Sequence, residues 1–241
     1  MRELGERVER YLVEAEQRGD LYARVNLQIA AGNMAWLARD EPQEARKRAS
    51  EALAAWSRDG YLLQHWYALR SLAQIDLYQG RSSEAYERTA REWGPLTRSL
   101  IARPEHIFIE TRQLRGRVAL AAAAHPRHAR ALSEAEQAAK QLVRVGEPWS
   151  VSFARLLDAG IAHRRGDRTR AVKLFREAIE LCEKSELRLH AAAARRRLGE
   201  LVPGRDGERE QQLGTEFLLE QGIRAPERFT QMLVPGDPTR S

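Results

Sequence analysis

The sequence predicts an all-α protein, built as a solenoid of antiparallel helix pairs. The first observation is an internal repeat. An alanine near the start of an expected helix occurs four times, at Ala45, Ala85, Ala131 and Ala171, with spacings of 40, 46 and 40 residues. A fixed period of this size is typical of helical repeats, whose units bury their apolar faces against their neighbours. The second observation is composition. Ala, Leu, Glu and Arg dominate while Val, Ile and Thr are scarce, a mixture that favours helix over strand.

The repeat also sets a register within the helices. Three of the four alanines are followed at +4 and +7 by further apolar residues: Ala49 and Ala52, Ala135 and Ala138, and Phe175 and Ala178. Where two helices cross most closely, only a small side chain lets their backbones approach. We therefore expect these positions to be buried at the crossings.

Composition and charge exclude several classes of protein. The chain has 241 residues and is 43% hydrophobic, which is enough for a sizeable core. Cys182 is the only cysteine, so no intramolecular disulfide can form and a reducing compartment is expected. No run of 18 consecutive apolar residues occurs and the N-terminus lacks the apolar core of a secretory signal. We therefore expect a cytoplasmic protein with no membrane partner.

Turn residues delimit the expected helices of the first half. Asp20 is placed to cap one helix, and Pro42 occupies a first helical position. The dipeptide Gly94-Pro95 is expected to interrupt the pattern, and the extra piece after it accounts for the longer spacing of 46. The expected helices are 2–17, 21–38, 42–57, 61–79, 83–93 and a short piece at 96–102.

Similar signals divide the second half. Pro104 and Pro126 each start a helix, Gly166-Asp167 forms a turn, and the stretch from Pro203 to Gly207 reads as a loop. The expected helices are 105–124, 127–145, 149–165, 168–184, 186–200, 208–221 and 226–233.

Turns this short force consecutive helices to lie antiparallel as neighbours. Helices 21–38, 61–79, 105–124, 149–165 and 186–200 are then the first members of the pairs. The expected organisation is a half repeat at 1–18, repeats that start near 20, 60, 104, 147 and 186 and run to 202, capping helices at 203–233, and a disordered tail at 234–241.

The half repeat at the start carries a separate expectation. When Gly19 is aligned with Gly60, helix 2–17 takes the place of a second helix with no first helix before it, and Leu4, Val8 and Tyr11 take the alanine positions. Solenoids normally end in a polar cap. One interpretation is that the chain is a piece of a longer protein whose upstream part covers this helix. The alternative is that the charged helix is itself the cap.

Residues Arg155 to Cys182 form the clearest unit. Ala159, Gly166-Asp167, Ala171, Phe175 and Ala178 stand at the spacings of the small and aromatic positions of tetratricopeptide repeats, so the unit resembles a long, divergent member of that class. The resemblance implies a right-handed solenoid.

The chain as a whole is similar to a narrower group, the C-terminal helical region of large multidomain bacterial serine/threonine protein kinases. The likeness lies in four segments: 19–23, 74–80, 193–200 and 221–226. In that family a kinase domain and a signal-transduction ATPase module precede a TPR-like tail. The resemblance implies a regulatory or scaffolding module.

No catalytic motif accompanies this likeness. The sequence contains no Gly-rich phosphate loop, no His-Arg-Asp and no Asp-Phe-Gly, which a kinase needs, and no Walker-type loop. We therefore expect a chain that is not itself an enzyme and needs no cofactor. Its function would be to bind a protein or peptide partner, which includes the upstream domains of a parent chain.

Polar residues on otherwise apolar first helices mark a candidate partner groove. A buried carboxylate such as Asp76 is costly unless it is paired, so two interpretations stand. Either the polar residues line a groove that receives a partner peptide, or they form ion pairs that fix the register of neighbouring repeats. The candidate groove residues are Gln64, His65, Gln74, Asp76, Glu110 and Arg117.

Arginines suggest a second function. The net charge is +6, and 36 of the 40 basic residues are arginine. A basic patch could bind nucleic acid, with an affinity that falls steeply with salt. Interspersed acidic residues weaken this hypothesis, since they dilute the field. The candidate patch consists of Arg164, Arg165, Arg168, Arg170, Lys173, Arg195, Arg196 and Arg197.

The sequence also bears on ligand, metal and thiol chemistry. A small-ligand sensor, with its ligand between first helices, is a third function. His125 and His128 lie three apart at a helix start with no third ligand nearby in sequence, which disfavours a metal site. Cys182 falls on an apolar stripe and reads as a small buried hydrophobe rather than a nucleophile.

Overall fold

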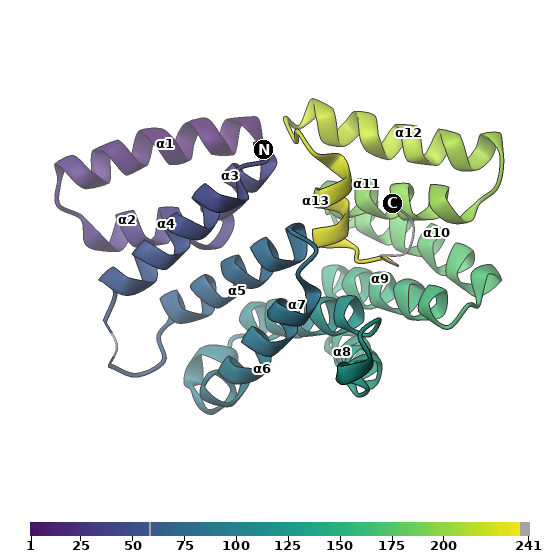
Figure 1. Ribbon diagram of the computed structural model, residues 1–241, viewed down its shortest axis with the longest axis horizontal. Helices are drawn as coiled ribbons and strands as arrows, with labels where there is room; N and C mark the ends of the chain where they lie inside the picture. The colour runs from purple at the N-terminus through teal and green to yellow at the C-terminus, as the bar shows by residue number, and fades with distance from the viewer. Residues whose placement is uncertain (58, 237–241) are drawn as a thin grey trace.

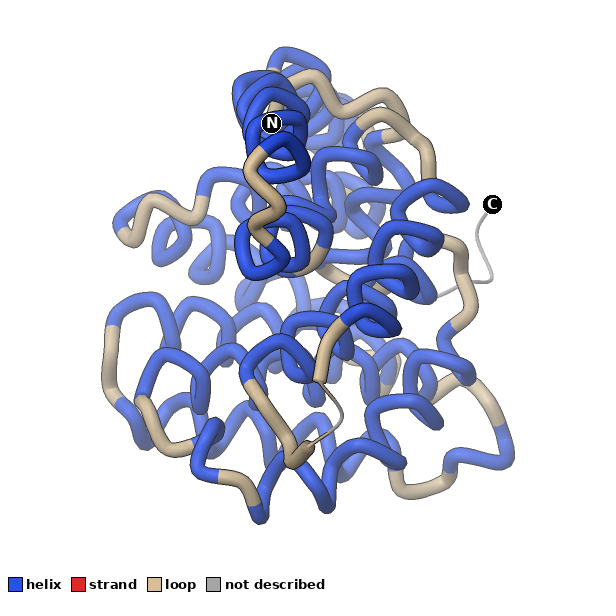
Figure 2. Tube along the Cα trace, turned by 90° about the vertical axis from the view of Figure 1, so that its left-hand side faces the viewer, coloured by secondary structure: helices blue, strands red, loops and turns tan. Residues whose placement is uncertain are grey.

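The computed structural model describes residues 1–57 and 59–236, and within these ranges it contains helices and loops but no strand (Figure 2). The first half holds α1 (Arg2–Gln17), α2 (Leu21–Gln28), α3 (Ala30–Ala38), α4 (Pro42–Ala55), α5 (Leu63–Tyr78) and α6 (Ser82–Arg98). The second half holds α7 (Glu105–Ala122), α8 (Ala131–Val145), α9 (Pro148–Arg164), α10 (Arg168–Lys184), α11 (Arg188–Leu201), α12 (Arg205–Glu220) and α13 (Pro226–Leu233). Two 3-10 turns, η1 (Leu100–Ala102) and η2 (Pro126–His128), precede α7 and α8.

Neighbouring helices pack in pairs, as a helical repeat requires. From α4 to α12, each helix contacts the next one along the chain, and α7 also contacts α5 and α9 (Figure 1). These contacts place α5, α7, α9 and α11 in one layer and α4, α6, α8, α10 and α12 in the other. We call the first set the inner helices. None of the helices in the described ranges combines the length and the apolar character needed to cross a lipid bilayer.

The expected burial of the recurring alanines is confirmed. Ala45, Ala85, Ala131 and Ala171 are all fully buried. The residues at +4 and +7 that the sequence singles out are buried as well. In α1 the register is only partly right. Val8 and Leu12 are buried, but Tyr11 is 43% exposed, so its alignment with an inward position is wrong.

The expected helix 21–38 is two helices, because the backbone breaks at Ile29 and Ala30. Ile29 is extended, and Ala30 has a φ of 56° in the left-handed region. The Nδ2 of Asn33 donates to the carbonyls of Gln28 and Ala45, at 2.9 and 2.8 Å. These side-chain hydrogen bonds replace a helical partner for Gln28, which is how Asn competes with regular helix.

The Gly94-Pro95 break is also wrong, since α6 continues through Pro95 to Arg98. The hydroxyl of Thr97 donates to the carbonyl of Trp93 at 2.8 Å, and fully buried Leu96 anchors the last turn. The expected start at 127 shifts to Ala131, after the turn η2.

The expected loop at 203–207 is only partly right, because Pro203 and Gly204 lie outside a helix but residues 205–207 form the first turn of α12, which packs closely on α11. A Cβ at Gly207 would lie 1.9 Å from the carbonyl oxygen of Val202, and one at Gly214 would lie 2.4 Å from that of Ala192. Glycine is therefore the residue that lets these two backbones touch.

The chain curves so that α1 and α3 lie beside the turn that follows α12. The N–H of Arg2 donates to the carbonyl of Gln221 at 3.1 Å, and the N–H of Arg224 donates to the carbonyl of Ala38 at 2.8 Å. Beyond this junction α13 lies in the centre of Figure 1, where it packs against α5 and α11. The capping role expected for 203–233 is therefore wrong for α13, which fills the inside of the curve.

The tail also differs from its expected disorder. Val234, Pro235 and Gly236 are buried against the inner helices, since their carbonyls and apolar atoms find partners there. Disorder is therefore the wrong expectation for these three residues. Residues 237–241, the rest of the expected tail, lie outside the described part of the chain.

Candidate functional site

The inner helices hold a segment of the chain's own C-terminus. We call residues 223–236 the C-terminal segment, and the surface of α5, α7, α9 and α11 that it covers the inner face. Phe229 and Met232 are fully buried there, and Leu233 and Val234 are nearly so. Burial of apolar side chains of this size contributes about 1.5–3 kcal/mol each. The inner face thus buries the apolar stripe of a short helix.

Three arginines of the inner helices hold the main chain of this segment. Arg117 on α7 donates to the carbonyl of Met232 at 2.9 Å, and the Nε of Arg197 on α11 donates to that of Val234 at 2.8 Å. Arg164, at the end of α9, reaches the carbonyl of Gly236 at 3.4 Å. The last carbonyls of a helix have no partner within it and carry its negative dipole end. Cationic donors are therefore well matched to this end of α13.

The side chain of Arg117 is the most unusual group on the inner face. It is 2% exposed, and no carboxylate pairs with it among the residues that the structure describes. Its Nε has no hydrogen-bond partner. Burial, followed by repulsion from Arg70, lowers the pKa of Arg117 to about 9. Such a group is costly to bury, and the carbonyl of Met232 compensates only in part.

His190 on α11 is the second perturbed group there. Burial, followed by the charge of Arg117, lowers the pKa of His190 to about 3. Its ring lies 5.0 Å from that of Phe153, in an edge-to-face arrangement. The imidazole therefore stays neutral at ordinary pH and packs as an aromatic group.

The first turn of α13 is joined by an ion pair to Asp40, in the loop between α3 and α4. Arg228 donates to Asp40 at 2.9 Å, and the hydroxyl of Tyr78 donates to the same carboxylate at 2.8 Å. Burial, followed by the hydrogen bond to Asp40, raises the pKa of Tyr78.

A small cavity of about 10 Å³ remains beside Arg117 and Val234. A space of this size is at the lower limit for a single water, so the interface is closely packed.

Asp76 is not part of the inner face. It is 1% exposed and pairs with Arg46 of α4 at 2.5 Å and with Arg88 of α6 at 2.9 Å. The two arginines come from the outer helices on either side of α5. The groove role expected for Asp76 is therefore wrong, and it forms the ion pairs between repeats that the sequence left as the other interpretation.

Most of the remaining groove candidates also have partners or places within the repeats. Glu110 pairs with Arg70 at 2.5 Å, which joins α7 to α5. The Nδ1 of His65 accepts from the N–H of Leu62 at 3.0 Å and so caps the start of α5. Gln64 and Gln74 are buried on α5. Of the six candidates, Arg117 is the one whose hydrogen bond to the C-terminal segment is resolved.

Several residues of the expected basic patch have partners within the chain. Arg165 pairs with Glu136, Arg195 pairs with Glu183 and Glu210, and Lys173 lies at 4.0 Å from Glu177. The guanidinium of buried Arg196 bonds to Thr215, while Arg164 and Arg197 face the C-terminal segment. Arg168 donates to the carbonyl of Leu201, and Arg170 is exposed. Four of the eight residues, Arg165, Lys173, Arg195 and Arg197, thus have an acidic partner, while Arg168 and Arg170 are exposed, and binding of nucleic acid there stays a prediction.

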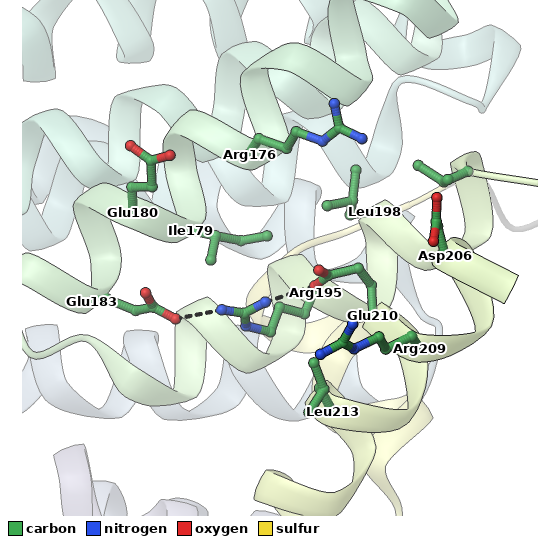
Figure 3. A pocket seen from close by; sticks show the side chains of 11 residues that line it. Arg176, Ile179, Glu180, Glu183, Arg195, Leu198, Asp206, Arg209, Glu210 and Leu213 are labelled. Carbon is green, nitrogen blue, oxygen red and sulfur yellow. Dashed lines mark hydrogen bonds and ion pairs between the residues drawn. The ribbon is translucent and has the colours of Figure 1, made fainter.

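A surface pocket of about 550 Å³ lies between α10, α11 and α12 (Figure 3). Charges of both signs line it, and Arg195 at its wall already bridges Glu183 and Glu210 at 2.7 Å each. Arg176, Glu180 and Asp206 also face it. The charges on its wall thus largely neutralise one another.

Cys182 is fully buried, and burial, followed by the charge of Glu183, raises the pKa of its thiol to about 12. The side chain of Cys182 packs as a hydrophobic group.

His128 packs against Tyr86, with 4.6 Å between the ring centroids, and its Nε2 contacts the hydroxyl of Ser83. Within the described ranges no group of three metal-ligating side chains comes together.

A comparison with protein-family models, curated proteins and solved structures gave no match. The inner face therefore has to be interpreted from its own chemistry. The sequence reasoning missed the C-terminal segment as its occupant. One signal in the sequence points to it: Phe229, Met232 and Leu233 recur at helical spacing after Pro226, which indicates that the expected capping helix has a buried face.

Proposed function

We propose that this chain is a non-catalytic, TPR-like module that binds a peptide or protein partner on its inner face. In this proposal the helix pairs wind as a right-handed solenoid. The hydrogen bonds from Arg117 and Arg197 to the carbonyls of Met232 and Val234 are the observation that supports it. They show donors directed at main-chain atoms, which every peptide offers.

The apolar part of the inner face supports the same function. Leu120 on α7 and Phe153 and Leu157 on α9 line the space beside Leu233. A helix bound in a groove lays its apolar side chains against such a surface, and here the side chains of Arg117 and Arg197 donate to main-chain carbonyls at the end of that helix. Affinity then comes from burial, and the polar contacts fix the direction of the helix.

The cellular setting of the proposal rests on the sequence resemblance. It is a regulatory tail of a bacterial serine/threonine kinase, located in the cytoplasm, whose partners include the kinase and ATPase parts of a parent chain. A continuous reading frame upstream of Met1 that encodes those parts would support this setting.

A peptide array tests the binding function. The purified full chain would be incubated with overlapping peptides from the host proteome, and hits would be measured by calorimetry. The proposal expects saturable binding at micromolar concentration, carried by peptides with an apolar helical stripe. Arg197→Met should weaken these hits, while Lys173→Met, which changes an exposed cation on α10, should not. An array without saturable hits would count against the function.

A further inference from the structure

The C-terminal segment and an external ligand would compete for one place. We propose that residues 223–236 act as a built-in ligand of the inner face, and that a partner binds by exchanging its own short helix of the same chemistry for this segment. The inference rests on the proposed function and adds the partner's chemistry and its regulation. The partner's segment carries apolar residues at the spacing of Phe229, Met232 and Leu233, followed by an extended residue in the place of Val234.

The connection of the segment to the rest of the chain permits exchange. Within the described residues it is joined to α12, which ends at Glu220, through Gln221 and Gly222, and Gly222 has a φ of 82°. The remaining contacts are noncovalent and come from side chains of the inner helices and from the first unit. Exchange therefore needs a change at one linker and leaves the helix pairs intact.

The fit of the segment is incomplete at its polar atoms. The Nε of Arg117 and the hydroxyl of Thr230 are buried, and neither has a hydrogen-bond partner. Arg117 is 2% exposed and Thr230 is 1% exposed. Buried donors that lack an acceptor cost free energy. A foreign helix that presents an acceptor side chain to Arg117 would recover this cost, and so would have an advantage over the tethered segment.

Tethering sets the level of competition. A segment attached by a short linker acts at an effective concentration in the millimolar range. A free copy of the same segment therefore binds the wild-type chain weakly. It binds better when the tethered copy is weakened and the inner face is left unchanged.

The test uses a fluorescein-labelled synthetic peptide with the sequence of residues 223–236 and the full chain, measured by fluorescence anisotropy. The double variant Phe229→Ala/Met232→Ala weakens the tethered copy. We expect it to bind the free peptide about tenfold more tightly, or better still, than the wild-type chain does. The matched control is Leu213→Ala/Leu219→Ala, which truncates two exposed apolar residues of α12 and should leave binding unchanged. A peptide with both alanine substitutions should not bind.

Absence of peptide binding to a double variant that still unfolds cooperatively would overturn the inference, because the segment would then be a fixed part of the core. Hydrogen exchange of the wild-type chain covers the case in which the variant does not fold. We expect amides of 227–234 to exchange through local opening about a hundredfold faster than those of α9 and α10. Exchange of both only by global unfolding would contradict the inference. A peptide from the array that binds the wild-type chain and the double variant with equal affinity would contradict the exchange proposed here. The proposed binding function would still hold in that case.

Discussion

The guanidinium of Arg117 on α7 donates a hydrogen bond of 2.9 Å to the carbonyl of Met232 on α13, 115 residues further along the chain. The contact holds the last turn of α13 against the inner helices. It also gives a buried cation its one resolved acceptor in the described part of the chain, at the negative end of a helix dipole. The repeat in the sequence does not predict a contact between these two residues, yet this contact fixes the end of α13 on the inner face.

Asp76→Ala should destabilise the chain strongly. The substitution removes the carboxylate that Arg46 and Arg88 share. These two ion pairs join α4 and α6 to α5. Both arginines are about a quarter exposed and can turn partly to water, so we expect a loss of about 2–4 kcal/mol rather than the full cost of breaking a buried pair. Urea unfolding measures it. Glu3→Ala is the control, since its pair with Arg7 is exposed and should contribute less than about 0.5 kcal/mol.

Ala171→Leu and Ala131→Leu should each lower the melting temperature. Both alanines are fully buried where the helices of a pair meet. A larger side chain there forces the helices apart, at a cost of about 1–3 kcal/mol. Lys173→Leu, on the exposed side of α10, serves as the comparison. Equal melting temperatures for all three variants and the wild type would contradict the assigned crossings.

Gly32→Ala should destabilise the first unit more than its small size suggests. A Cβ at this position would lie 2.1 Å from the carbonyl oxygen of Leu27, so the break between α2 and α3 would have to change. We expect a loss of about 1–3 kcal/mol from overpacking. Ala30→Gly should be neutral or mildly stabilising, because it relieves a left-handed φ of 56°. Thermal unfolding of the two variants should therefore shift in different directions or by clearly different amounts.

His190 should make the chain less stable as the pH falls below 6.5. Its pKa in the folded state is about 3, so the unfolded chain binds a proton at a pH where the folded chain does not. Stability from this group is therefore present above pH 6.5 and is lost toward pH 3, by up to about 1.4 kcal/mol for each pH unit. Unfolding free energies between pH 6.5 and 5 measure the slope. His190→Phe should flatten it, whereas His106→Gln, at an exposed position, should not.

The thiol of Cys182 should not react in the folded chain. It is fully buried, and burial keeps its pKa near 12, so little thiolate forms. A chromogenic disulfide reagent at pH 8 should find no accessible thiol until denaturant is added. Rapid reaction of the native protein, with no loss of helix signal, would show that α10 opens locally.

Local pattern was sufficient for most elements because it acts over a few residues. Asp20 accepts from the N–H of Ala23 and Asp167 from that of Arg170, as expected for residues that cap helices. It failed where a distant group intervened. The carbonyl of Ala45 accepts from Asn33 and helps to break α2 from α3, and residues 205–207 of the expected loop are helical, where Gly207 lies against the backbone of Val202.

The amino-acid sequence by itself determined that this chain is a stack of helix pairs and which small residues lie at their crossings. Period and side-chain volume are local properties, and Ala131 and Ala171 carry both. Only the tertiary structure decided what the polar residues do. Asp76 and Arg117 look alike in sequence, as single charges on apolar helices. The packing of α4 and α6 against α5 brings Arg46 and Arg88 to Asp76, whereas the return of α13 to the inner helices brings Met232 to Arg117, 115 residues away in sequence. Both contacts depend on how whole helices pack, which no short stretch of sequence specifies.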